Sequence, residues 1–170
     1  MAEPTRAYRS AQKGNAMTQY PLLFTFLNKV EGNNYLAEIA VHGRALAEKE
    51  EGGWWIYGVH PGGLAASGPS LPEAYAEFRK AFLKVLFEEA SEADNFYAFR
   101  AGARKFFDEI SRPTLAEWEA AREQVRAGKI TIDGMRQETA ESPRRIDIKE
   151  KQTFAAKDNA VDDPQAAVAA

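Results

Sequence analysis

An apolar stripe of helical spacing between residues 70 and 88 is the feature that most constrains the fold of this chain. Apolar side chains recur there at steps of three and four residues, and Glu and Lys occupy the other side. The stripe consists of Leu71, Ala74, Tyr75, Phe78, Ala81, Phe82, Val85 and Leu86. Ser70 and Glu73 have the spacing of a capping box, and Pro72 lies in the first turn, where its missing N–H costs little. Because the stripe needs an apolar partner, we expect a helix of roughly five turns that lies across a sheet.

The segments before this helix predict the sheet. Residues 20–29 are aromatic and apolar and end at a Gly-Asn-Asn turn, and residues 35–42 alternate with the period of a strand, so together they predict a hairpin. Residues 43–51 fit either a continued strand or one helical turn. Residues 54–59 (WWIYGV) are rich in aromatic and β-branched types and predict a strand, and residues 64–67 predict a short strand or an extended arm.

Two further helices are predicted, at about residues 94–110 and 114–127. The second opens on another capping-box pattern, TLAE, and its apolar stripe is thin, so we expect it to dock on another element. That stripe consists of Leu115, Trp118, Ala121 and Val125. Residues 129–133 (KITID) are a candidate for a short strand. Beyond residue 137 the sequence shows no periodic pattern and is rich in Ala, Asp, Glu, Lys and Gln, which is typical of disorder.

These patterns predict an α+β fold, in which one main amphipathic helix covers a small antiparallel sheet. The predicted organisation is a disordered N-terminal arm over residues 1–18, a sheet–helix domain over 19–90, a helical extension over 91–136 and a disordered tail over 137–170.

The order Gly-Gly, aromatic strand, turn, short strand, Gly and capped helix over residues 52–86 resembles the HicB-type antitoxin family. The matching positions are Gly53, Trp54, Ile56, Gly68, Ser70, Leu71, Glu73 and Ala74. The chain departs from the family pattern at the turn, where Gly58, Val59 and His60 replace Phe-Pro-Asp, and no DNA-binding segment is evident after residue 90. The resemblance implies a partial ribonuclease-H fold without the nuclease residues. It also implies a homodimer that neutralises a small ribonuclease toxin by covering the toxin's surface.

Composition excludes several other classes of function. The chain has no cysteine, which excludes disulfides, cysteine-based zinc sites and cysteine nucleophiles. Its net charge of −3 does not favour electrostatic binding of nucleic acid through this chain alone. No apolar run approaches the roughly 20 residues of a membrane helix, and the first residues do not resemble a secretory signal. We therefore expect a cytoplasmic protein that needs no membrane, cofactor or metal.

The aromatic strand contains the residues that we predict to bind a partner. Adjacent strand residues face opposite ways, so Trp55 and Tyr57 point away from the helix if Trp54 and Ile56 point toward it. An outward Trp and Tyr can anchor a protein interface or stack on bases, or a second layer such as the next helix can bury them. His60 lies in the turn beside these aromatics. The predicted partner-binding residues are therefore Trp55, Tyr57 and His60.

No catalytic residue is predicted. A nuclease of the ribonuclease-H type needs several carboxylates around metal ions about 4 Å apart, and the first strands offer only Glu38. Glu73 is better explained as a helix cap, and His42 and His60 do not have the spacing of a metal site. The expected function is binding without turnover, as in a HicB-like antitoxin. The alternatives are a stand-alone regulatory or scaffold module of the same fold and, from another class, a weak metal-dependent nuclease.

Overall fold

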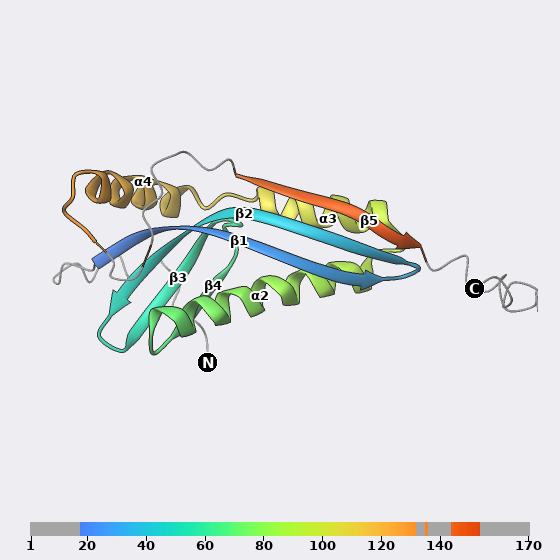
Figure 1. Ribbon diagram of the computed structural model, residues 1–170, viewed down its shortest axis with the longest axis horizontal. Coiled ribbons are helices and arrows are strands. Elements are labelled where there is room, and N and C mark those ends of the chain that lie inside the picture. Colours follow the sequence, from blue (N-terminus) through green and yellow to red (C-terminus); the bar gives the residue numbers. More distant parts are fainter. Residues whose placement is uncertain (1–17, 132–134, 136–143, 154–170) are drawn as a thin grey trace, which may run out of the picture.

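The structure is a computed structural model that describes residues 18–131, 135 and 144–153 (Figure 1). Within these residues, five strands form one curled antiparallel sheet and three helices pack on it, which confirms the α+β class. The elements in chain order are β1 (Thr18–Gly32), β2 (Tyr35–Glu50), β3 (Gly53–His60), β4 (Ala65–Gly68), α2 (Leu71–Glu92), α3 (Phe96–Asp108), α4 (Arg112–Arg126) and β5 (Arg145–Thr153). The predicted N-terminal arm lies outside the described residues except for Thr18, and so do residues 137–143 and 154–170 of the predicted tail.

β2 is the central strand of the sheet. Along one edge it pairs with β1 from Tyr35 to Lys49. Its other edge is divided, because β5 pairs with the first half as far as His42 and β3 pairs with the second half from Arg44 onward. β4 then pairs with β3 at the far edge of the sheet. The region 43–51, which the sequence left open, is strand as far as Glu50, because neighbours on both edges satisfy its backbone.

The predicted disorder of residues 137–170 is wrong for β5. Ile146 and Ile148 face the same side of the sheet, and Ile148 is 6% exposed in the main core. Charged residues between and around these two isoleucines dominate the local composition and concealed a strand pattern of period two. A partner edge on β2 and an apolar core beneath it stabilise this segment as a strand.

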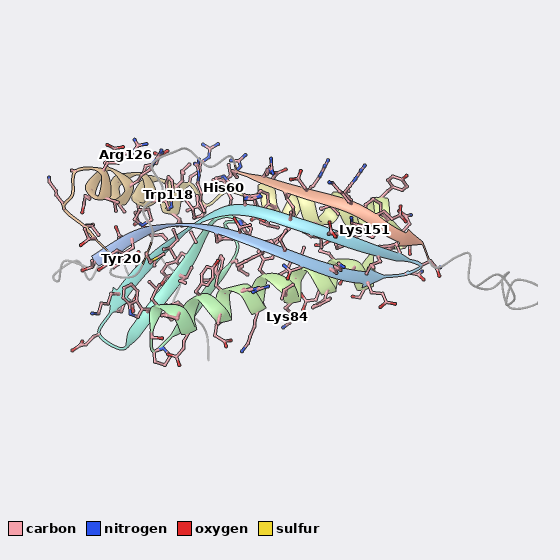
Figure 2. All side chains as sticks on the ribbon, viewed as in Figure 1. Tyr20, His60, Lys84, Trp118, Arg126 and Lys151 are labelled. Atoms are coloured by element: carbon pink, nitrogen blue, oxygen red, sulfur yellow. The ribbon has the colours of Figure 1, made fainter. Side chains whose placement is uncertain are left out.

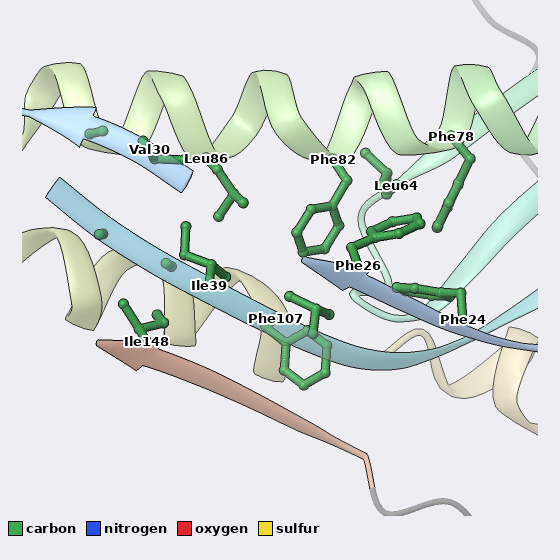
Figure 3. Close-up of a cluster of buried hydrophobic side chains, with 14 of the residues drawn as sticks. Phe24, Phe26, Val30, Ile39, Leu64, Phe78, Phe82, Leu86, Phe107 and Ile148 are labelled. Carbon is green, nitrogen blue, oxygen red and sulfur yellow. The ribbon is translucent and has the colours of Figure 1, made fainter. Parts of the chain in front are cut away.

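One face of the sheet, here called the inner face, is covered by α2 and α3 (Figure 3). Phe24 and Phe26 of β1 meet Phe78 and Phe82 of α2, with ring centroids 5.4 Å apart for Phe24 and Phe78. The fully buried apolar residues of α2 are Ala74, Phe78, Phe82 and Leu86. The predicted stripe therefore lies across the sheet, as expected. Burial of each such ring or leucine contributes roughly 1.5–3 kcal/mol.

The start of α2 follows the predicted capping box. The Ser70 hydroxyl accepts a hydrogen bond from the backbone N–H of Glu73 at 3.3 Å and donates one to the Glu73 carboxylate at 2.6 Å. Gly68, at the end of β4, is in close contact with this first turn. A Cβ at Gly68 would lie only 2.6 Å from the backbone nitrogen of Ala74, so glycine allows the strand and the helix to touch.

The two other helices lie on opposite faces of the sheet. α3 begins at Asn95, whose side chain caps the backbone N–H of Ala98, and it adds its own phenylalanines to the inner-face core. α4 packs on the other face, here called the outer face, as expected from its thin stripe.

The prediction that a capping box at Thr114 opens the last helix is wrong. α4 begins at Arg112, because Pro113 fits its first turn, and Thr114 is buried with its hydroxyl bonded to that of Ser111. Residues 129–131 form no strand, and the rest of the KITID candidate lies outside the described residues.

Candidate binding surface

The outer face of β3 carries the predicted aromatic pair. The rings of Trp55 and Tyr57 stack with centroids 5.8 Å apart and planes 9° from parallel, and both side chains are half-buried. Ile56 is fully buried on the inner face, and Trp54 packs against the same core with its ring 5.4 Å from that of Tyr20. The predicted orientation of this strand is therefore confirmed.

The helix that packs on the outer face is α4, and not the helix at residues 94–110 that the sequence suggested. α3 lies on the inner face, so it does not form a layer over the aromatic pair. α4 brings Trp118 and Ala121 against Leu46 of β2 and Val59 of β3, and these four residues form a second, smaller core.

His60 lies apart from the aromatic pair, in the interior at the end of β3. It is 1% exposed, so its side chain is not part of the exposed surface around Trp55 and Tyr57. Its Nε2 accepts a hydrogen bond from Nη1 of Arg144 at 2.6 Å, which leaves the ring proton on Nδ1. Burial, helped by the positive charges of Arg144 and Arg44 and opposed by Asp108, lowers the pKa of His60 to about 4. The imidazole is therefore neutral at pH 7.

Arginines from distant parts of the chain contact His60 and Trp118, two residues that are labelled in Figure 2. The guanidinium of Arg44, the cross-strand neighbour of His60, lies 4.8 Å from the centre of the Trp118 ring, and that of Arg122 lies 5.5 Å from it. Sequence reasoning missed this cluster, because its members come from β2, α4 and the residue before β5. The isolated Trp in the thin stripe of α4 was the only signal available.

The rest of the outer face is formed by β1, the first half of β2 and β5. It is apolar along β1 and polar between β2 and β5. In Figure 1 no described helix lies in front of these three strands. Leu27 of β1 is 68% exposed and Leu23 is 37% exposed. Glu38 forms an ion pair with Lys151 at 3.4 Å, so the one carboxylate suggested for a nuclease faces outward and is paired with a lysine.

Within the described residues, no group of three or more His, Asp or Glu side chains is arranged to hold a metal ion. His42, the other histidine, lies on the outer face with its Nδ1 3.2 Å from the hydroxyl oxygen of Thr25. No described helix is long and apolar enough to cross a membrane.

Comparison with protein-family models, with curated proteins and with solved structures found no match to this chain. The resemblance of residues 52–86 to the HicB-type family therefore stays a prediction. The geometry of the outer face is the remaining evidence on function.

Proposed function

We propose that this chain is a binding protein of the HicB-like antitoxin type, which neutralises a small ribonuclease toxin by steric occlusion. The observation that carries the proposal is the Trp55–Tyr57 stack on the outer face of β3. Trp and Tyr dominate the energetics of protein interfaces because they bury a large area and lose few rotamers. A stack formed in the unbound chain is already ordered, which lowers the entropic cost of binding.

The resemblance supplies the identity of the partner. Its matching residues make up the unit of β3, β4 and the start of α2, in which Gly68 touches the first helical turn and Ser70 caps it. A protein that acts by covering a toxin needs a rigid surface and no reacting groups. The aromatic pair lies on a strand that is paired on both sides, by β2 and β4, and this gives the surface its rigidity.

The proposal includes a homodimer formed through β1. This strand ends the sheet, and among the described strands only β2 pairs with it. Leu23 and Leu27 are exposed on its outer side, two positions before and after Thr25. A two-fold axis through Thr25 would place Leu23 of each copy opposite Leu27 of the other copy, which gives two equivalent leucine contacts.

Co-expression with the product of an adjacent gene tests the antitoxin proposal. We expect a small basic neighbour to co-purify with the full chain and the chain to rescue growth when the neighbour is toxic. Replacement of both Trp55 and Tyr57 by Ala should weaken the complex at least about thirtyfold, since an aromatic anchor contributes about 2 kcal/mol or more. The control is Tyr97→Ala, because Tyr97 is an exposed aromatic residue on α3.

Failure to co-purify together with failure to rescue growth would eliminate the antitoxin role. Equal binding by the double variant and by Tyr97→Ala would move the interface away from β3. Light scattering tests the dimer separately: Leu27→Lys should give a monomer, whereas Phe87→Lys on the exposed side of α2 should not change the mass.

A further inference from the structure

Two arginines next to His60 are held by uncharged partners. Arg144 donates to the neutral imidazole of His60, and Arg44 stacks on the indole of Trp118. Arg144 is exposed and Arg44 is partly buried. The hydrogen bond and the stacking orient both guanidiniums, and neither the imidazole nor the indole carries a negative charge.

The two guanidiniums are close because of the sheet register. Arg44 and His60 are cross-strand partners at the point where β3 takes over the edge of β2 from β5. Arg144 directly precedes β5, and this divided edge brings it to the same imidazole. Both positive charges act on the His60 ring, so both guanidiniums lie near it.

Among the residues that the structure describes, two N–H donors beside His60 and Arg44 have no acceptor. With the His60 Nε2 accepting from Arg144, its Nδ1 carries the proton, and that nitrogen is buried without a hydrogen-bond partner. The Nε of Arg44 is likewise buried without a partner. A buried donor that lacks an acceptor costs about 1–3 kcal/mol. A ligand that offers only lone pairs and negative charge would remove this cost and the repulsion between the arginines.

The surrounding charges favour an anion as well. The groups that act on His60 are Arg144, Arg44 and Asp108, two positive charges and one negative. The local balance is therefore positive, in a chain whose overall net charge is −3.

We propose that Arg44, His60 and Arg144 form a binding site for a phosphate group. A phosphate group presents its oxygens in a tetrahedral arrangement, so guanidinium forks and an imidazole N–H that approach from different directions can each donate to it. The group comes either from a free phosphate or from the backbone of a single-stranded nucleic acid. This site is independent of the antitoxin proposal, because it shares neither residues nor partner with the aromatic pair.

Binding of inorganic phosphate to the full chain at pH 7 provides the first test. Phosphate and chloride are compared at equal ionic strength by calorimetry and by the shift in melting temperature. We expect binding by the native chain and at least about tenfold weaker binding by Arg144→Gln, since a charge-assisted hydrogen bond contributes about 1.5–3 kcal/mol. The matched control is Arg145→Gln, because Arg145 is the next residue and pairs with Asp147 at 3.0 Å.

A short single-stranded oligonucleotide forms the second arm and distinguishes the source of the phosphate. Binding of inorganic phosphate that depends on Arg144 indicates a free phosphate ligand. Binding of the oligonucleotide alone, again dependent on Arg144, indicates the nucleic-acid backbone. The proposal is overturned if phosphate acts no differently from chloride and the oligonucleotide does not bind, or if both Gln variants behave alike. Arg144→Lys, which keeps the charge and loses the fork, should bind at an intermediate level and shows that the site still folds.

Discussion

The indole Nε1 of Trp118 donates a hydrogen bond to the backbone carbonyl oxygen of Leu22 at 3.2 Å, across a sequence separation of 96 residues. This bond attaches α4 to β1 on the outer face, while α2 and α3 occupy the inner face. The sheet is therefore covered on both sides over its β1–β2–β3 half. The side chain that makes the bond also supports the guanidinium of Arg44.

Trp118→Phe tests this attachment. The variant keeps an aromatic ring in the small outer-face core but loses the N–H, so the free energy of unfolding should fall by about 1–3 kcal/mol. Urea unfolding monitored by circular dichroism measures the change. Trp55→Phe, which alters the half-buried stacked pair, is the control and should have a smaller effect. A loss for Trp118→Phe no greater than the control would mean that α4 is not held by this bond.

Phe78→Ala tests the packing of α2 on the sheet. Phe78 is fully buried between the helix and the rings of Phe24 and Phe26, so its removal leaves a cavity and should cost about 3–5 kcal/mol. The same unfolding measurement applies. Phe87→Ala, on the other side of the same helix and 51% exposed, should cost less than about 1 kcal/mol. Similar losses for the two variants would contradict the observation that α2 packs on the sheet through the side that carries Phe78.

Ile148→Ala tests β5. Ile148 lies opposite Ile39 of β2 and is buried in the main core, so we expect a loss of about 2–4 kcal/mol. Its neighbour Lys149 faces the other way and is exposed, and Lys149→Ala should be nearly neutral. Protection of the β5 amides from hydrogen exchange offers a second measurement. Rapid exchange of these amides in the native chain would argue that the strand does not form.

The pH dependence of stability reports on His60. Because the folded state holds the His60 pKa near 4, below its ordinary value of 6.5, the unfolded chain takes up a proton first as the pH falls. The stability that the neutral imidazole contributes is complete above pH 6.5 and is lost as the pH falls toward 4. Between pH 7 and pH 5 we expect a loss on the order of 2 kcal/mol at this residue.

His60→Gln isolates that contribution from the titration of carboxylates. Glutamine keeps an acceptor for Arg144 and does not titrate, so the variant should lose less stability than the native chain over the same pH interval. Urea unfolding at pH 7 and pH 5 on both proteins gives the comparison. An identical loss for both would show that His60 is protonated in the folded state as readily as in the unfolded one.

Local patterns in the sequence predicted most of the individual elements. The capping box at Ser70, the stripe of α2 and the outward direction of Trp55 all depend on residues within a few positions of one another. Such features follow from the periods of helix and strand, which any short window of sequence reveals. The dependence of α4 on a docking partner was also visible, because its stripe is too thin to stabilise a helix alone.

Tertiary structure decided where these elements meet. The sequence between residues 145 and 153 is highly charged and reads as disordered alone, yet an open edge of β2 and the core beneath Ile148 make it a strand. The same divided edge brings Arg144 to His60, and the choice of the outer face for α4 brings Trp118 to Arg44. Local periodicity carries no information on such pairings, because they depend on which surfaces remain unpaired after the sheet has formed. The sequence by itself therefore determined the elements and their apolar faces, whereas only the folded chain determined the cluster of charges around His60.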